Sequence, residues 1–383
     1  MVRPLAVAAA LAAGVLAARA AAAGATGRWV VSNERPVPLE WFQGLTHAPD
    51  GSRFFVGVFE GVTRTDALLR RRVRTEAAVP AEVKAQYGFN HIGDPTYDRA
   101  EGGRLLVPLE CYVPGGPNGG NTCGRGAIGV LDPVTLGWRY LVLLDQAAIA
   151  KAMWAEVSPD GTLLWTSSGP DLLAFRTADV SAANAAAGTA IQPVRRLAGA
   201  VPPGGVAGAA FDGSRLVLSE PGAGEVRLWS VDVDGAGTPR LEATLPVDAE
   251  AEGLDVLPTG DGLLHWLLSP FAPGGRRPTY GTGHSEIVSL VPRAQARLHL
   301  VVTRGFPGRI TANVTLRLAG EARPVAGAVV RTTGSRARTN ARGDVVLRTR
   351  VPASRRIVVT ARKQQLRAAR VVAPGAARPR IPG

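Results

Sequence analysis

Six polar side chains occupy matching places in a pattern that this chain repeats five times. Each copy joins an apolar pair to a Pro-Asp-Gly-like turn and then to a hydrophobic run. The copies begin at Gln43, His91, Met153, Gly205 and Glu252, and three residues later stand Thr46, Asp94, Glu156, Gly208 and Asp255. Carboxylates that meet from separate copies repel one another unless a cation or retained protons lie among them. The metal or ligand candidates are therefore Gln43, His91, Asp94, Glu156, Glu252 and Asp255.

These residue types suit Ca²⁺, which prefers carboxylate and amide oxygens in flexible geometry. With His91, Mn²⁺ or Zn²⁺ also becomes possible, although the sequence has no HExxH motif and no cysteine cluster. Such an ion would polarise a carbonyl or phosphoryl oxygen, while His91, the candidate catalytic residue, or one of the carboxylates transfers a proton. The alternative is a solvated channel in which the acidic residues only bond backbone amides or water.

The spacing of the copies predicts the elements that carry these side chains. Successive copies start 48, 62, 52 and 47 residues apart, and each has strand-turn-strand character. A repeat of this length indicates a β-propeller, here of five to six blades over residues 28–293, with the six side chains on the innermost strands. Residues 28–41 are expected to form the outer strand that closes the ring against the last blade. Short helices are expected at Pro80–Tyr87 and Gln146–Ala152.

After Pro292 the pattern changes to short alternating strands, which predict a β-sandwich over residues 294–373 and a disordered tail over 374–383. The fold class is thus all-β. The string PVAGAVVRTTGSRARTNARGDVVLRT, residues 324–349, resembles the carboxypeptidase-regulatory-like or bacterial Ig-like repeat. That resemblance implies an accessory module without catalytic activity.

Several features predict export. Arg3, an apolar stretch and the Ala21-Ala22-Ala23 site are typical of a signal peptide over residues 1–23. Cys111 and Cys123 flank a loop rich in glycine and asparagine, so a disulfide that closes it is expected, with a metal pair as the alternative. The protein should be secreted or associated with the cell envelope.

The charge of the chain is unevenly distributed. Residues 294–383 carry 19 lysines and arginines against two acidic residues, a net +17, whereas the preceding 293 residues carry 25 against 29, a net −4. A basic module of this kind suggests contact with an anionic envelope polymer, or peripheral contact with membrane or wall. The alternative is the arginine-rich composition of a GC-rich genome. Specific nucleic-acid binding is not expected, because Phe306 is the only aromatic residue after Tyr280.

Two resemblances bear on activity. The strings AEGLDVLPTGDG, residues 251–262, and FNHIGD, residues 89–94, resemble the calcium-dependent lactonase and gluconolactonase propellers, and the EGL openings resemble esterase-like phytase propellers. The Asn ligands of the lactonase family have no counterpart except Asn90. The sequence leaves two functions open: a binding or scaffold protein for a small ligand, glycan or peptide, and a metal-dependent hydrolase of lactones or phosphoesters. Because the sequence requires no nucleophile or base, binding is the preferred reading and no cofactor is certain.

Overall fold

The structure is a computed structural model that describes residues 26–372 apart from 58, 115–119, 223, 257–263, 271–283, 293–296, 305–308, 319–320, 326, 350, 352–354 and 364–365. The expected signal peptide and C-terminal tail lie outside the described residues. The chain divides into two compact units, one built mainly from Asn33–Leu257 with Leu264–Ser289, the other mainly from Leu290–Gly383.

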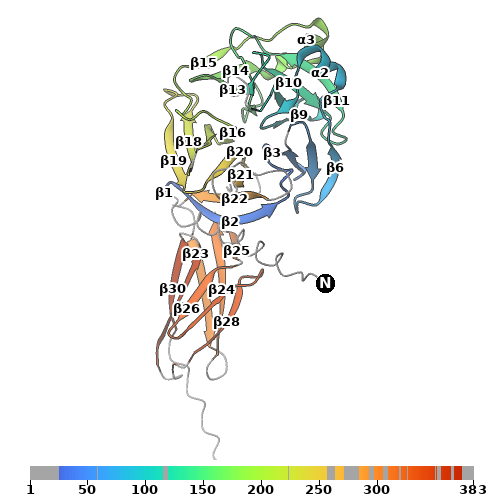
Figure 1. Ribbon diagram of the computed structural model, residues 1–383. Coiled ribbons are helices and arrows are strands. Elements are labelled where there is room, and N and C mark those ends of the chain that lie inside the picture. The colour runs from blue at the N-terminus through green and yellow to red at the C-terminus, as the bar shows by residue number, and fades with distance from the viewer. Residues whose placement is uncertain are drawn as a thin grey trace, which may run out of the picture. The chain divides into compact units, whose positions relative to one another are not determined.

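The first unit consists of five antiparallel sheets, which Figure 1 shows set around a common centre. Blade 1 contains β3 (Gly44–His47), β4 (Arg53–Val56), β5 (Val62–Thr65) and β6 (Arg71–Thr75). Blade 2 contains β7 (His91–Ile92), β8 (Thr96–Asp98), β9 (Arg104–Glu110), β10 (Ala127–Leu131) and β11 (Trp138–Leu143). Blade 3 contains β12 (Glu156–Val157), β13 (Leu163–Ser168), β14 (Asp171–Arg176) and β15 (Arg195–Leu197).

Blade 4 contains β16 (Gly208–Asp212), β17 (Arg215–Glu220), β18 (Val226–Asp232) and β19 (Arg240–Leu245), and blade 5 contains β20 (Ala249–Val256), β21 (Leu264–Pro270) and β22 (Ser285–Pro292). Two N-terminal strands complete these blades. The short β1 (Thr26–Gly27) pairs with β19, and β2 (Trp29–Val37) lies outermost, beside β22. The predicted propeller is confirmed, with five blades in the described part of the chain, and so is the closing strand on the last blade.

Apolar cores lie between neighbouring blades, because each sheet has two faces to bury. Phe54 of blade 1 and Leu105 and Leu109 of blade 2 are fully buried in one such core. Leu106 of blade 2 and Leu164 of blade 3 belong to the next. Alternate residues of β9 thus point to opposite neighbours, as the two-residue period of a strand requires.

The connections contain two short helices. The first, α2 (Ala81–Tyr87), was predicted; it ends at Gly88, whose φ of 82° is the left-handed conformation that glycine adopts readily. The helix expected at Gln146–Ala152 is wrong: Asp145 begins a single turn there, after which Ile149 is buried. The second helix, α3 (Ala182–Ala187), was not predicted, although the Ser181 hydroxyl caps it by accepting from the Asn184 amide. Short 3-10 turns lie at η1 (Ala100–Gly102) and η3 (Thr177–Asp179).

The second unit holds two four-stranded sheets. One contains β23 (Arg297–Arg304), β24 (Arg309–Leu318), β25 (Glu321–Pro324) and β28 (Asp344–Arg348); the other contains β26 (Val329–Thr332), β27 (Ser335–Arg338), β29 (Ile357–Lys363) and β30 (Leu366–Val372). Their inner faces share one core, to which Ile310 and Val314 contribute from the first sheet and Val330 and Val359 from the second. This is the expected β-sandwich, with β25 and β30 as strands that the sequence pattern had not indicated.

Two further features concern the chain as a whole. Cys111 and Cys123 form the expected disulfide, which closes a loop with a sequence separation of 12. Among the residues that the structure describes, none of the helices has the length and apolar character needed to cross a membrane.

Candidate functional site

Asp94 joins neighbouring blades through its backbone. Its amide donates to the Met153 carbonyl over 2.9 Å, and its own carbonyl accepts from the Ala155 amide over 3.0 Å. These bonds form an isolated parallel bridge between Asp94 and Trp154. Blade 2, to which Asp94 belongs, is thereby tied to the opening of blade 3.

The side chain of Asp94 reaches the three remaining blades. Its Oδ1 accepts from the Leu45 amide at 2.9 Å, and its Oδ2 accepts from the amides of Ala209 at 3.1 Å and Leu254 at 3.3 Å. These amides belong to the innermost strands of blades 1, 4 and 5. One fully buried residue therefore bonds all five blades and lies on their common axis.

Glycines allow this close approach. Each of the three donor amides follows a glycine, at positions 44, 208 and 253. A Cβ atom at Gly208 would lie 2.1 Å from the Glu252 carbonyl oxygen, and one at Gly253 would lie 2.4 Å from the Leu45 amide nitrogen. Real Cβ atoms do not come so near, so only glycine lets the strands converge on Asp94.

The environment of Asp94 favours a structural carboxylate over a metal ligand. Burial raises the pKa of Asp94 well above its ordinary value, while the amide bonds from Leu45, Leu254 and Ala209 favour the ionised form and oppose that rise. Both oxygens face N–H donors, whose positive hydrogens would repel a cation. Asp94 therefore does not fit the calcium role expected from the sequence.

Four buried side chains contact one another in a row on one side of Asp94 along the propeller axis. Glu252 Oε2 accepts from Gln43 Nε2 at 2.9 Å, Gln43 Oε1 lies 3.2 Å from His91 Nε2, and His91 Nδ1 lies 3.1 Å from Glu110 Oε1. All four are at most 6% exposed. Because the Gln43 amide group donates to Glu252, its oxygen must accept from His91. Hydrogen bonds through Glu252, Gln43 and His91 thus join blades 5, 1 and 2, and the Glu110 carboxylate lies within ion-pair distance of the imidazole.

Glu110 was not among the sequence candidates. It lies on β9 directly opposite His91 on β7, at the residue before Cys111. The rings of Tyr112 and Phe59 lie near His91, with centroids 5.1 Å and 6.4 Å from the imidazole. The alternation of β9 could have indicated Glu110, but only the pairing of the two strands identifies its partner.

A second polar cluster follows the level of Asp94. His47 Nδ1 lies 2.7 Å from Asp255 Oδ1, and Glu156 Oε1 accepts from the Phe211 amide at 3.3 Å. Burial raises the pKa of Glu156 from 4.5 to about 8. The hydrogen bond with Thr96 opposes this rise, and the negative charge of Asp255 adds to it. Glu156 is therefore largely neutral near pH 7, although part of the residue remains accessible to solvent. Sequence reasoning assigned no partner to His47.

The six predicted side chains do not form one site. Asp94 lies between two groups of these side chains. Along the innermost strands, one group comes before the residues that Asp94 bonds, and it consists of Gln43, His91 and Glu252. The other group comes after them and consists of Glu156 and Asp255. The alignment of turns had set Asp94 level with Glu156 and Asp255. Its side chain instead accepts from the amides of Leu45, Ala209 and Leu254, which are neighbours of the aligned residues in blades 1, 4 and 5. Across the described ranges, no group of three or more His, Cys, Asp or Glu residues is placed to bind a metal ion.

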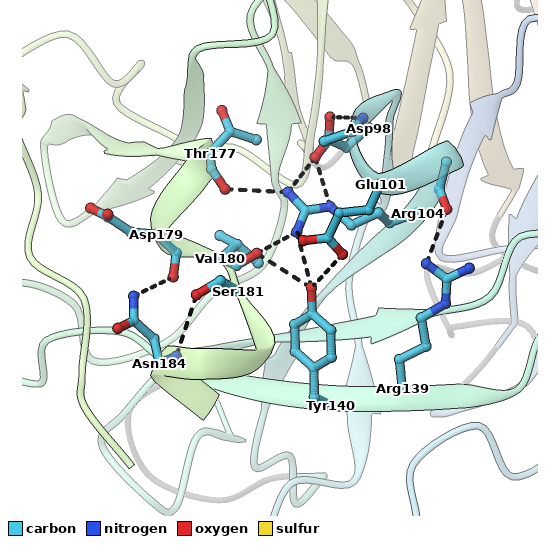
Figure 2. A network of polar contacts seen from close by, with 12 residues as sticks. Asp98, Glu101, Arg104, Arg139, Tyr140, Thr177, Asp179, Val180, Ser181 and Asn184 are labelled. Atoms are coloured by element: carbon cyan, nitrogen blue, oxygen red, sulfur yellow. Dashed lines mark hydrogen bonds and ion pairs between the residues drawn. The ribbon is translucent and has the colours of Figure 1, made fainter. Parts of the chain in front are cut away.

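A further buried network joins blade 2 to the segment that follows β14 in blade 3. Arg104, only 1% exposed, donates from Nε to Asp98 Oδ2 at 2.8 Å. Its guanidinium also donates to the backbone oxygens of Thr177, at 3.2 Å, and Val180, and to the Tyr140 hydroxyl at 3.0 Å. Figure 2 shows these groups converging on the guanidinium from both blades. The network fixes the angle between two blades and takes no part in the polar clusters on the axis.

We expect the free energy of unfolding to decrease as pH rises from 5 to 8.5. A carboxyl with a raised pKa binds a proton in the folded state that the unfolded chain releases near its ordinary pKa, so its stabilisation is lost between these values. His47 acts in the same direction: burial alone would lower its pKa, but Asp255 raises it overall, and that stabilisation is lost above the unfolded pKa. The expected loss is about 2 kcal/mol, reduced from the full linkage value because Glu156 is partly exposed.

Chemical denaturation across this pH range measures the effect. Glu156→Gln keeps the neutral form and should make the pH dependence measurably smaller, because only Asp94 and His47 then contribute to it. Glu82→Gln, on the exposed side of α2, should leave the pH dependence unchanged. Equal slopes for wild type and Glu156→Gln would show that Glu156 titrates normally.

Several solved structures are similar to this chain. The PQQ-bound aldose sugar dehydrogenase from Streptomyces coelicolor matches at 11% identity over 70% of this chain and 98% of its own, with a TM-score of 0.37. A luciferin-regenerating enzyme matches at 12% identity over 68% and 96%, with a TM-score of 0.44. The β-propeller domain of Cps50 (Swd1) from Myceliophteria thermophila matches at 12% identity over 64% and 82%, with a TM-score of 0.34. At such identities the similarity concerns the fold and not the activity.

No protein-family model matches the chain, and no curated protein sequence matches it significantly.

Proposed function

We propose that this chain is an exported binding and scaffold protein. Its propeller recognises a small ligand, glycan or peptide near one end of the axis, and its basic C-terminal sandwich holds the protein at an anionic surface of the cell envelope. The observation that carries the proposal is the use of Asp94, whose carboxylate accepts three backbone amides. The central acid of the propeller thus supports the scaffold, as a binding protein requires.

The polar chain that precedes Asp94 marks the end of the axis to which we assign the ligand. The half-buried rings of Phe59 and Tyr112 lie beside His91 there, and the buried side chains of Gln43 and Glu110 hold the imidazole between them. Aromatic surfaces next to a few oriented polar groups are the usual composition of sites for hydroxyl- or amide-bearing ligands. This end of the propeller is therefore where a glycan or peptide finds matching chemistry.

We assign the C-terminal unit to the carboxypeptidase-regulatory-like or bacterial Ig-like modules. The resemblance over residues 324–349 supports this assignment, together with two sheets that share one apolar core. Such a module is accessory, so its net charge of +17 serves attachment and not chemistry. Secretion through the N-terminal signal and closure of the Cys111–Cys123 disulfide fit the same compartment.

Metal analysis separates this proposal from its alternative, a metal-dependent hydrolase of lactones or phosphoesters related to the lactonase propellers. We expect the purified mature protein to hold no stoichiometric metal, and we expect EDTA or added Ca²⁺ to change its Tm by less than about 1 °C. A ligand that binds only the folded state stabilises it by RT ln(1 + [L]/Kd), so Tm rises with the logarithm of the ligand concentration once this exceeds Kd. A bound ion together with a Ca²⁺-dependent rise in Tm would favour the hydrolase.

Fractionation tests the envelope half of the proposal. In cells that express the full chain, the mature protein should begin near Gly24 and remain with the envelope at low salt. Raising the salt concentration should release it, because electrostatic attachment is screened. Recovery of the unprocessed chain inside the cell would contradict export.

A further inference from the structure

The sheet formed by β27, β26, β29 and β30 presents an outer face of one charge. Val330, Ala361 and Val359 point from this sheet into the core of the sandwich. The residues that alternate with them point outward, because side chains along a strand alternate between faces. Four of these outward residues are exposed arginines: Arg331, Arg336, Arg338 and Arg362.

The strand register brings these arginines together. Arg331 on β26 lies directly opposite Arg336 on β27, and Val329 lies in one row between Arg338 and Arg362. Like charges that lie opposite each other across two strands destabilise a sheet. The sequences of the four strands contain no Asp or Glu that would compensate. Arg338 also donates to the Gly327 carbonyl at 3.2 Å, a neutral group that leaves its charge in place. The face therefore concentrates positive charge, which attracts an anionic partner.

The other sheet of this unit differs in its acidic residues. Its strand β28 carries Asp344, whose Oδ1 accepts from Asn313 at 2.8 Å. That sheet also has two exposed arginines opposite each other, Arg309 and Arg348, but Asp344 lies in the same pair of strands. The strands of the β27-β26-β29-β30 sheet contain arginines and no acidic residue.

The arrangement of the arginines indicates the shape of the partner. Neighbouring strands are about 4.8 Å apart, and alternate residues on a strand are about 6.8 Å apart, so the four guanidinium groups form a band that runs across three strands. A linear polymer lying across the strands would meet successive cations along this band. Guanidinium groups bind phosphate oxygens in pairs, which lysine cannot do.

Other features of this face exclude a partner that stacks or inserts. Within the described part of the face there is no aromatic ring on which a base could stack. Val358 is its one large exposed apolar side chain, at 52%, which is too little apolar surface to enter a membrane interface. We propose that Arg331, Arg336, Arg338 and Arg362 bind a linear phosphate-bearing polymer of the cell envelope. That the polymer belongs to the cell envelope rests on the proposed function. That it carries phosphate rests on the arginines that the strand register brings together.

Binding of inorganic polyphosphate to the purified full mature chain tests the proposal. The outer-face variant replaces the four arginines with glutamine: Arg331→Gln, Arg336→Gln, Arg338→Gln and Arg362→Gln. The control removes the same charge from exposed arginines elsewhere in the unit: Arg309→Gln, Arg342→Gln, Arg348→Gln and Arg355→Gln. All eight side chains are exposed, and an unchanged Tm confirms that each variant folds.

We expect the outer-face variant to bind polyphosphate at least about 10-fold more weakly at moderate salt, and the control less than about 3-fold more weakly. The slope of log Kd against log salt should fall by about three for the outer-face variant, one unit or slightly less for each lost phosphate contact. Equal losses in both variants would overturn the proposal in favour of net charge alone. Tighter binding to vesicles that contain phosphatidylglycerol, at equal phosphate concentration, would overturn it in favour of a membrane.

The two proposals fail separately. If the protein stays with the envelope and is released by salt, but the outer-face variant does so equally, the arginine band is wrong and the scaffold function stands. If the purified chain binds polyphosphate through the band but is never exported, the function is wrong and the band stands.

Discussion

Replacing Asp94 with asparagine should reduce the free energy of unfolding of the propeller by about 3–5 kcal/mol, the largest effect of any single polar substitution on the axis. The carboxylate accepts amides on both oxygens, from Leu45 on one and from Ala209 and Leu254 on the other. Asparagine keeps a single acceptor and directs an NH₂ group at an N–H donor. At least one buried amide then loses its partner, and all five blades share the disturbance.

Thermal and chemical unfolding measure this effect, with an expected decrease in Tm of about 10 °C. Asp160→Asn is the matched control: Asp160 is exposed in the blade 3 turn, where it also accepts a backbone amide, from Thr162 at 3.1 Å. That variant should lose less than about 1 kcal/mol. A similar small loss for Asp94→Asn would mean that the three amides are satisfied without the charge. Added Ca²⁺ should restore neither variant.

The sequence was sufficient to predict the propeller, because its strands and turns follow from local sequence patterns. The helix expected at Pro80–Tyr87 is α2, and the segment expected to close the ring contains β2. The helix expected at Gln146–Ala152 is wrong, because the chain makes a single turn after Asp145 and then buries Ile149. The tertiary contact of Ile149 outweighed the local preference for a helix there.

The site was less accessible to sequence reasoning, since its partners come from different blades. His47 and Asp255 are 208 residues apart, and Gln43 and Glu252 are 209 apart. Aligning the turns selected residues of the innermost strands, but it set Asp94 level with Glu156 and Asp255. The bonds of Asp94 to the other blades make it a structural centre instead, separate from the two polar clusters.

Arg104→Met should also be strongly destabilising, by about 3–5 kcal/mol, because it leaves Asp98 buried and without its cation. Asp98 is 2% exposed, and the backbone oxygens of Thr177 and Val180 would each lose one of their two donors at the same time. The matched control is Arg139→Met. Arg139 lies in the same region (Figure 2) and pairs with Asp132 at 2.7 Å, but at the surface, where such a pair contributes at most about 1 kcal/mol.

A double variant distinguishes a buried ion pair from simple loss of packing. Asp98→Asn removes the charge yet keeps an acceptor for the Ala100 amide, which bonds Asp98 at 3.0 Å. If the cost of Arg104→Met comes from an uncompensated carboxylate, the double variant should be more stable than the sum of the single losses by at least about 1 kcal/mol. Strict additivity would instead assign the cost to the lost contacts of the guanidinium with blade 3. Because those contacts join two sheets, either result shows how an interface between blades is held by a cation that no local sequence signal identifies.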